Sequence, residues 1–546
     1  MSVPGAIAPV EIGGKLYVDG GLLQNLPVAA ARAACADRVI VVNVGSGLLP
    51  REELGSAVAI SLQMLNVLME QNVRASLASL GPDDILIEPR LGNFSSANFT
   101  DAMPLVAVGE AAARSKAEAL RTLSVSEAEY RAWRAAVAAR LPRVPPVTEV
   151  RVATEGSRVN PTVIERELAQ VPGVDLRNRP ETDFSLENLN ARLEQVYGRG
   201  DFERMDYQFI DQPGSRTVEV QGVEKSWGPN YVKFGLGLAS DSDETRFTAS
   251  ASHRRTWINA LGAEWRNDLQ LGHRQQFASE FIQPVAFKAG AFAAPRIDLQ
   301  KEPVVYYLGG RRIGEYRVKH ARAHLDFGVQ DKYGEARLGA FTGTLSADED
   351  FGLVTGVPDF DLNQVGVTGR LVFDQIDSPH FGRSGALAAL NLFATLDDWG
   401  SEDDYSKIDL MLVGAKSFDR HAFQVAGYYG TKLSGDLPPY DPFLLGGFLR
   451  GSGYRMDELI GDEVAMVRGV YSYQIATLPT PLGRGVYLGA SIEATEATLG
   501  VDLNDSQKVR PSASLFLGAD AILGPAYVAW GRGVGVDIPV ALLLRL

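Results

Sequence analysis

Hydrophobic and polar residues alternate along most of the second half of the chain. In the segment 487–496, Leu488 and Ile492 share one face, while Ser491 and Glu493 share the other. The same period of two recurs in the segments 244–252, 384–396 and 407–412. Because successive side chains of a strand point to opposite faces, each such segment predicts a strand with one apolar face. Roughly sixteen of these segments follow one another from residue 230 to the end, separated by Gly, Asp, Asn, Ser and Pro.

A series of alternating strands fits either a soluble all-β sandwich or a membrane β-barrel. The number of strands, the near absence of helix and the small residues on the apolar face favour the barrel. In lipid every backbone polar group needs a partner, and a closed barrel provides one for each. No apolar run approaches the ~20 residues that a membrane-spanning helix needs. We therefore expect residues 227–546 to form a transmembrane antiparallel β-barrel of about sixteen strands.

Residues 1–140 have a different pattern, typical of an α/β domain. The continuous apolar run 38–44 predicts a strand buried on both faces, and the shorter run 84–89 predicts another. Apolar positions at helical spacing predict one long helix within 51–80. Ala-rich helices are expected at 104–122 and 126–140.

Residues 141–147 contain three prolines and predict a short, stiff linker. After it, residues 148–226 predict a second, small α/β unit with the order strand, helix, helix, strand, strand. The expected elements are 149–152, 160–169, 185–198, 202–209 and 216–220. A small α/β module of any other family would also fit this order.

Composition narrows the possible partners. The chain has 546 residues, a net charge of −14 and a pI of about 5.1, which argues against nucleic-acid binding. Its single cysteine, Cys35, cannot form an intramolecular disulfide. The first residues have no charged and apolar regions of a signal peptide, so none is expected in this sequence.

The candidate chemistry lies in the stretch Tyr17–Pro27, where a short apolar strand ends in Asp19, followed by Gly20 and Gly21. Glycines allow a tight turn that can bring an aspartate to the edge of a sheet, where α/β proteins bind ligands. Asn25 and Pro27 then open a helix predicted from Val28 to about Cys35. An ordinary Asp-Gly turn is the simpler interpretation of such a dipeptide.

The longer string Asp-Gly-Gly-Leu-x-x-Asn-x-Pro resembles the second catalytic block of the patatin-like phospholipases, and the string from Ile85 to Phe99 also resembles that family. The resemblance implies a partial patatin-like domain over residues 1–140 and a phospholipid substrate. It implies that Asp19 is the aspartate of a Ser-Asp dyad, the base for serine attack on an ester. Gly20 and Gly21 would shape the turn, and Asn25 and Pro27 would fix the helix start. It implies no cofactor.

The serine of such a dyad is missing from this sequence. No Gly-x-Ser-x-Gly occurs, because Ser46, Ser384 and Ser452 each lack a required glycine, and no glycine-rich oxyanion loop precedes Asp19. All six histidines fall after residue 250, and His320 and His324, four residues apart on a predicted strand, make no metal site. We therefore expect the chain as given to be inactive alone. Three explanations remain open: a start placed inside the protein, a truncated gene, or a remnant that serves as a binding or structural cap.

Further strings resemble outer-membrane proteins. The segment 197–202 resembles part of a POTRA domain, and 373–385 resembles the opening block of the bacterial surface-antigen barrels. The segment 444–454 resembles their loop that folds into the lumen, with Arg450 and Gly451 at the position of an arginine that pairs with acidic wall residues. The apolar end 538–546 resembles a signal for the barrel-assembly machinery, although Leu546 replaces the usual aromatic residue.

Together these resemblances imply an amino-terminally truncated autotransporter of the patatin type in the bacterial outer membrane. A lipase passenger would be carried by one POTRA domain and a barrel in contact with outer-membrane lipids. The alternative is an outer-membrane barrel for protein translocation or assembly, with a vestigial lipase segment. Oligomeric state is open, and a homo-oligomer is one alternative.

Overall fold

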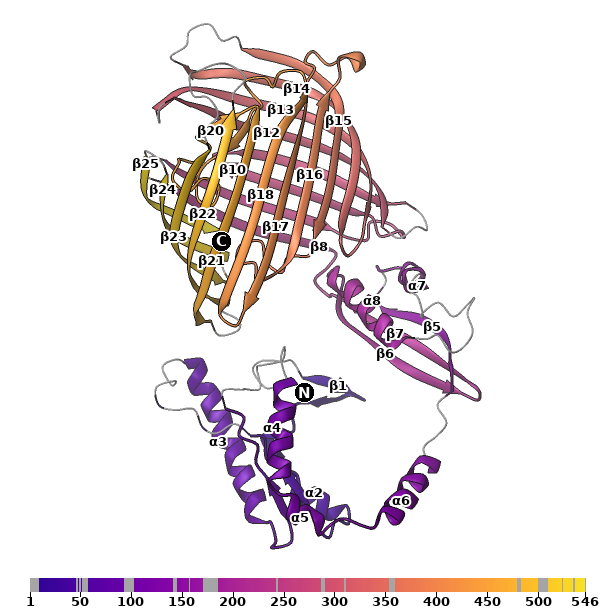
Figure 1. The fold of residues 1–546 in the computed structure, drawn as a ribbon. Helices are drawn as coiled ribbons and strands as arrows, with labels where there is room; N and C mark the ends of the chain where they lie inside the picture. Colours follow the sequence, from indigo (N-terminus) through magenta and orange to yellow (C-terminus); the bar gives the residue numbers. More distant parts are fainter. Residues whose placement is uncertain are drawn as a thin grey trace. The chain divides into compact units, whose positions relative to one another are not determined.

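The computed structural model describes residues 9–45, 48, 51, 57–92, 103–140, 145–156, 158–169, 185–241, 244–285, 290–308, 311–352, 359–478, 483–498, 509–522, 524–533 and 536–545 (Figure 1). The chain divides into two compact units, Met1–Arg143 and Val144–Leu546. In the described parts of the chain, no helix is both long enough and apolar enough to cross a membrane.

The first unit contains two separate pairs of short strands and six helices in its described residues. Its elements are β1 (Val10–Ile12), β2 (Lys15–Tyr17), α1 (Gly21–Gln24), α2 (Val28–Ala33), β3 (Ile40–Val42), α3 (Ala57–Ala78), β4 (Ile85–Ile87), α4 (Met103–Arg114), α5 (Ala117–Arg121) and α6 (Glu127–Arg140). The predicted strands and helices after residue 38 are therefore present, although the helix expected at 104–122 is divided into α4 and α5. Strands β3 and β4 pair in parallel, whereas β1 and β2 form an antiparallel hairpin of their own. The short helix α1 was not predicted.

The prediction that the strand around residues 38–44 is buried on both faces is wrong for the described structure. Val41 is 6% exposed, but Ile40 and Val42 on the opposite face are 51% and 48% exposed. The reason is that packing covers one face only: Val41 belongs to a cluster with Val28 and Val73. The run of β-branched residues indicated a strand correctly but not how many layers cover it.

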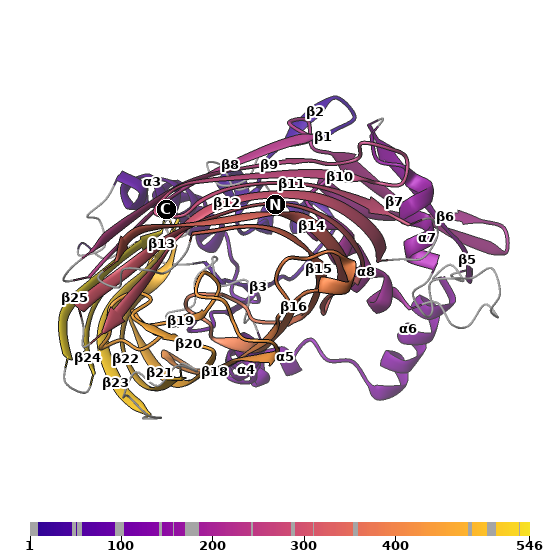
Figure 2. The same cartoon turned by 90° about the horizontal axis from the view of Figure 1, so that it is seen from above.

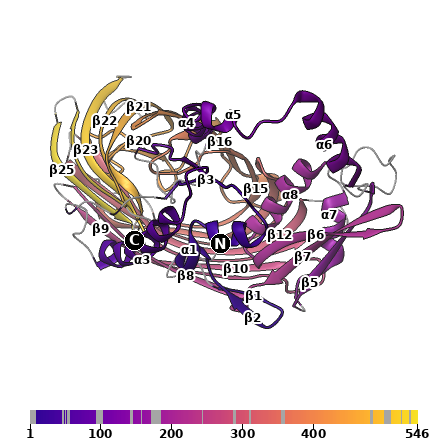
Figure 3. The ribbon, with the colours of Figure 1, turned by 90° about the horizontal axis from the view of Figure 1, so that it is seen from below.

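Residues 147–224 form the predicted unit of strand, helix, helix, strand, strand. Its elements are β5 (Val147–Glu155), α7 (Pro161–Ala169), α8 (Leu186–Gly198), β6 (Phe202–Gln212) and β7 (Ser215–Glu224). The sheet order is β5-β7-β6, with β5 parallel to β7, and both helices lie along one side of the sheet (Figure 3). Ser185 caps α8 by accepting a hydrogen bond from the Asn188 amide, and the two helices bury Ile164 and Leu189 against the sheet. This order is that expected of a POTRA domain, and the assignment to that family stays a prediction.

The rest of the second unit is a closed antiparallel barrel, built from sixteen strands in the described residues. They are β8 (Asn230–Ser240), β9 (Thr245–Arg255), β10 (Glu264–Gly272), β11 (Gln275–Pro284), β12 (Ala291–Leu308), β13 (Arg311–Gln330), β14 (Gly334–Gly352), β15 (Phe360–Asp374), β16 (Ser384–Thr395), β17 (Ser406–Phe418), β18 (His421–Ser434), β21 (Glu463–Thr477), β22 (Gly483–Thr498), β23 (Arg510–Ala521), β24 (Gly524–Gly533) and β25 (Val536–Arg545). The last strand closes the ring by pairing with the first, from Leu542–Ser240 to Arg545–Gly237. The predicted barrel is confirmed.

The alternation of the sequence becomes the alternation of the two barrel faces. On β22, Leu488 and Ile492 are 53% and 73% exposed on the outer wall, whereas Ser491, Glu493 and Thr495 are buried in the interior. Between β18 and β21 the chain folds into the lumen, where β19 (Phe443–Leu445) and β20 (Leu459–Gly461) form a small hairpin inside the ring (Figure 2). We call residues 435–462 the luminal loop.

Candidate functional site

The luminal loop is anchored to the barrel wall by a buried carboxylate. Glu493 of β22 is 5% exposed, and its Oε2 accepts hydrogen bonds from the backbone N–H groups of Gly451 at 2.7 Å and Ser452 at 2.8 Å. Its Oε1 accepts hydrogen bonds from the hydroxyls of Ser452 at 2.5 Å and Ser491 at 2.6 Å. Hydrogen bonds to an ionised acceptor are stronger than neutral ones, so this carboxylate is the strongest polar anchor of the loop tip.

Glycines allow the loop tip to approach the wall this closely. Gly451 has a φ of +114°, a conformation that other residues rarely adopt. A Cβ atom on Gly531 of β24 would lie 1.6 Å from the carbonyl oxygen of Ser452. A Cβ on Gly453 would lie 1.8 Å from the backbone nitrogen of Gly533. The Gly-Ser-Gly segment 451–453 is therefore the part of the loop that docks on the wall.

The arginine next to this anchor comes from the wall rather than from the loop. Arg450 is exposed, and its Nη2 donates to the carbonyl of Leu444 at 2.7 Å. Arg468 of β21 stands directly across from Glu493, and its Nη1 donates to the carbonyl of Leu449 at 2.6 Å. The resemblance implied that Arg450 pairs with acidic wall residues; in the structure the backbone N–H groups of Gly451 and Ser452 bind the wall carboxylate instead. Glu493 was visible in the sequence as a lone charge on a face of small polar residues.

A second set of contacts anchors the first part of the loop. The Tyr440 hydroxyl donates to Asp403 at 2.7 Å, and the Tyr405 hydroxyl donates to Asp441 at 2.7 Å. Lys407 of β17 donates to the same Asp441 at 2.6 Å. Tyr405 is 1% exposed, so this contact lies in the packed interior.

A second ion pair and two apolar clusters complete the attachment. Arg246 of β9 pairs with Asp457 at 2.5 Å, on the opposite wall from Lys407. Phe443, Leu445, Tyr454 and Leu459 of the loop are buried with wall residues in one cluster, and Tyr440 and Ile460 are buried in another. The luminal loop is thus a packed plug rather than a chain suspended in water.

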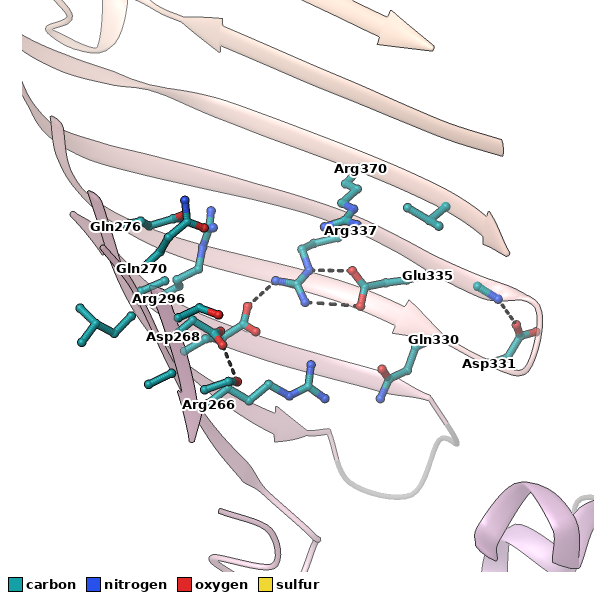
Figure 4. A pocket seen from close by; sticks show the side chains of 18 residues that line it. Arg266, Asp268, Gln270, Gln276, Arg296, Gln330, Asp331, Glu335, Arg337 and Arg370 are labelled. Atoms are coloured by element: carbon teal, nitrogen blue, oxygen red, sulfur yellow. Dashed lines mark hydrogen bonds and ion pairs between the residues drawn. The ribbon is translucent and has the colours of Figure 1, made fainter. Parts of the chain in front are cut away.

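The lumen contains an open polar chamber of about 750 Å³. It lies near the end of the barrel at which β8 begins, directly after the small α/β unit. Its lining comes from inward positions of β9 to β15, including Arg266, Asp268, Arg296, Arg337 and Arg370 (Figure 4). Arg337 pairs with Glu280 at 2.5 Å and with Glu335 at 3.1 Å. Pockets for small molecules have a similar size, about 300–1,000 Å³, but are mostly apolar. A chamber lined by charged and polar side chains suits water or a polar chain better than a small apolar ligand.

The Asp19 turn belongs to the first unit and has a simple geometry. Asp19 is half-buried at the end of the hairpin β1–β2, not on the parallel pair β3–β4, and its Oδ1 accepts the Gly21 amide at 2.8 Å. A Cβ on Gly21 would lie 3.0 Å from Asp19 Oδ1 and 3.1 Å from Asn25 Oδ1, so glycine is needed there. Gly20 precedes α1, and Pro27 precedes α2, which ends at Ala33 rather than near Cys35.

Among the residues that the structure describes, Asp19 accepts a hydrogen bond from the Gly21 amide and makes none with a serine or cysteine. The nearby helix serines bind backbone carbonyls: Ser76 donates its hydroxyl to Leu26, and Ser79 donates to Ser76. Ser46 and the string around Phe94 and Phe99 lie outside the described residues.

His320 and His324 both lie on strand β13. His320 bonds Asp298 at 2.9 Å inside the barrel. Within the described ranges, no group of three His, Cys, Asp or Glu side chains is arranged to hold a metal.

Comparison with known proteins identifies the fold. No protein-family model matches the chain. BamA from Haemophilus ducreyi lacking POTRA domains 1-3 matches with a TM-score of 0.55 and 14% identity, over 74% of this chain and 85% of that one. CdiB from Escherichia coli matches with a TM-score of 0.50 and 13% identity, over 92% of this chain and 100% of that one. The chain therefore has the fold of a transmembrane β-barrel of the BamA and CdiB type.

Proposed function

We propose that this protein is a bacterial outer-membrane barrel that translocates or assembles other polypeptides. The observation that carries the proposal is a closed sixteen-stranded barrel, in its described residues, with a polar lumen that is plugged by its own anchored loop. The fold shared with BamA and CdiB supports this role over that of a lipase anchor. The small α/β unit at residues 148–226 would be a POTRA domain on the periplasmic side.

The proposed path runs through the lumen, so it can be tested by position. A photoreactive amino acid at Gln270 of β10 lines the polar chamber, whereas one at Leu271, its neighbour, faces outward and is 49% exposed. In living cells, position 270 is expected to crosslink to secreted or outer-membrane polypeptides. Position 271 serves as the matched control and is expected to crosslink to lipid or to nothing. Equal capture at both positions, or none at position 270, would contradict a luminal path.

The membrane location has a test of its own. A folded outer-membrane barrel resists detergent at room temperature and migrates differently in gels after boiling. We expect this heat-modifiable migration. A protein that purifies as a soluble monomer without detergent would refute the membrane assignment.

The second candidate function is the patatin-like phospholipase, supported by the Asp19 string and its glycine turn. Asp19 would be the dyad base, and the serine would have to come from elsewhere, because this sequence has no Gly-x-Ser-x-Gly. We expect no phospholipid hydrolysis by the chain as given. Release of fatty acid from phospholipid vesicles that disappears in Asp19→Asn would reverse the order of the two candidates.

A further inference from the structure

The outer wall of the first four barrel strands contains a group of polar residues near one end, next to an apolar middle part. Two rows of outward positions cross β8 to β11 near the end that follows the small α/β unit. Strand register places Asn230, Arg255, Trp265 and Phe281 in the first row, and Val232, His253, Asn267 and Ser279 in the second. Their outward direction follows from the alternation, because Val232 and Leu269 on the same faces are 56% and 41% exposed.

Five of these side chains form one continuous chain of hydrogen bonds. Trp265 Nε1 donates to Ser279 Oγ at 2.9 Å, and Ser279 donates to Asn267 Oδ1 at 2.8 Å. Asn267 Nδ2 contacts His253 Nδ1 at 3.2 Å, and His253 Nε2 contacts Asn230 Oδ1 at 3.1 Å. Because the amide of Asn267 is a donor, His253 Nδ1 accepts and its Nε2–H donates. In this series of hydrogen bonds the side-chain oxygens of Ser279, Asn267 and Asn230 act as acceptors. The amide N–H groups of Asn230 stay available as donors.

Arg255 is the cation of this surface. It is exposed, and the register places it directly across from Asn230 on one side and Trp265 on the other. Neither row contains a carboxylate. Arg255 makes no hydrogen bond or ion pair in the part of the chain that the structure describes. The groups that remain available on this surface are therefore a guanidinium and amide donors, which select an anion.

Beyond the second row the outer wall is apolar. The next outward positions are Phe234, Leu269 and Phe277, which are 82%, 41% and 40% exposed. Each step of two residues along a strand is about 6.7 Å, so the cation lies roughly 13 Å from the third row. A molecule that contacts both the donor groups of the first row and the apolar third row has an anionic head and apolar tails. Tryptophan beside the cation is the residue that proteins favour at the level of lipid headgroups.

We propose that Arg255, Asn230 and Trp265 bind the phosphate headgroup of an anionic phospholipid, whose acyl chains lie on Phe234 and Leu269. The lipid belongs to the leaflet on the side of the small α/β unit. Guanidinium and amide donors hold the phosphate oxygens, and the hydrogen-bonded chain through His253 fixes the position of Asn230. The inference rests on the proposed membrane setting but not on polypeptide transport.

The test measures lipid retention by the full chain in detergent with native mass spectrometry, using phosphatidylglycerol as the probe. Arg255→Gln removes the cation, and Arg420→Gln, an exposed arginine in the β17–β18 turn, removes the same charge elsewhere. A cation beside an anionic membrane surface contributes about 1 kcal/mol, so we expect phosphatidylglycerol to bind about fivefold more weakly to Arg255→Gln. Arg420→Gln is expected to bind as the unaltered protein does.

Glycerol phosphate separates a lipid site from a site for a small anion. At concentrations equal to the lipid, we expect it to displace almost none, because it lacks the acyl chains that contact Phe234 and Leu269. Equal lipid binding by Arg255→Gln and Arg420→Gln, or full displacement by glycerol phosphate, would overturn the proposal. Heat-modifiable migration of each variant, measured in parallel, separates loss of the lipid site from loss of the barrel.

Discussion

Removing the Glu493 carboxylate is expected to release the tip of the luminal loop. In Glu493→Ala the backbone N–H groups of Gly451 and Ser452, held at 2.7 and 2.8 Å, lose their acceptor in a buried environment. Each unsatisfied buried donor costs about 1–3 kcal/mol, and loss of one partner of a buried charged contact costs about 3–5 kcal/mol. Arg468, across from Glu493, also loses its counter-charge. We therefore expect the docked state of the loop tip to lose about 3–5 kcal/mol.

The conservative variant should have a smaller effect. In Glu493→Gln the amide oxygen can still accept the two backbone N–H groups, and the amide NH₂ can donate to the hydroxyls of Ser452 and Ser491 after these rotate. The lost contribution is the charge of the acceptor, about 1–2 kcal/mol in total. We therefore expect the docked loop tip to be most stable in the unaltered protein, less stable in Glu493→Gln and least stable in Glu493→Ala.

Two assays report release of the loop. Single-channel recording in planar bilayers should show higher conductance and more frequent opening in Glu493→Ala, with Glu493→Gln between it and the unaltered protein. Trypsin should cut after Arg450 in Glu493→Ala, since the next residue, Gly451, is no longer held to the wall. Glu496→Ala on the same strand is the control, because Glu496 lies on the outward face. Equal conductance and equal cleavage in Glu493→Ala and Glu496→Ala would refute the reasoning.

Two further outcomes follow from the structure. Gly531→Ala places a Cβ 1.6 Å from the Ser452 carbonyl oxygen, so the loop or strand must shift; we expect the barrel to unfold in detergent at a lower temperature, by overpacking of about 1–3 kcal/mol. In the first unit, hydrogen bonds from the Val39 and Gly81 amides hold the pKa of Asp84 below its ordinary value of 3.8. The ionised Asp84 therefore stabilises the fold above that pH, and this stabilisation disappears as the pH falls through the lowered pKa. The Val39 amide should lose its protection against hydrogen exchange, measured relative to an unstructured peptide at the same pH, only when the pH falls below 3.8 in the unaltered protein, and Asp84→Asn should lower this protection already at neutral pH; equal protection in both proteins at neutral pH would contradict this.

The sequence allowed the barrel to be predicted because its signal is local and repeated. The alternation read from the sequence of β22 is present in the structure, where Ile492 faces outward and Glu493 faces inward. The alternation within each strand shows which of its side chains face outward and which face inward. Closure of the sheet into a barrel then follows, because an unpaired strand edge is unfavourable in lipid. The helices α3 and α8 were likewise predictable from periodic apolar residues and, for α8, from the cap at Ser185.

The loop anchor could not be predicted, because it depends on which distant residues meet. The resemblance of residues 444–454 to a known luminal loop implied a loop in the lumen, but the choice between Arg450 and the backbone of Gly451 as the partner of Glu493 is decided by packing. Gly531, which makes room for Ser452, lies about eighty residues further along the chain. No local pattern connects these positions.

At the Asp19 turn the local conformation and the placement of the preceding strand have to be considered separately. A glycine is required at position 21, where a Cβ would lie close to Asp19 and Asn25. The strand before it was placed at the edge of a parallel sheet, whereas it forms the separate hairpin β1–β2. Tyr17 and Leu16 on this strand are 50% and 71% exposed, so an apolar residue next to a turn did not indicate membership in the main sheet. The dyad assignment of Asp19 stays a prediction.

The most direct test of the proposed role uses the protein in liposomes together with the polypeptide captured at position 270. The measurement is the rate at which that polypeptide, added unfolded, inserts into the bilayer or becomes protected from protease inside the vesicles. The account predicts a rate well above that of empty liposomes, and a lower rate when the chamber is blocked by a bulky label at Gln270 but not at Leu271. A rate equal to that of empty liposomes would contradict a role in translocation or assembly.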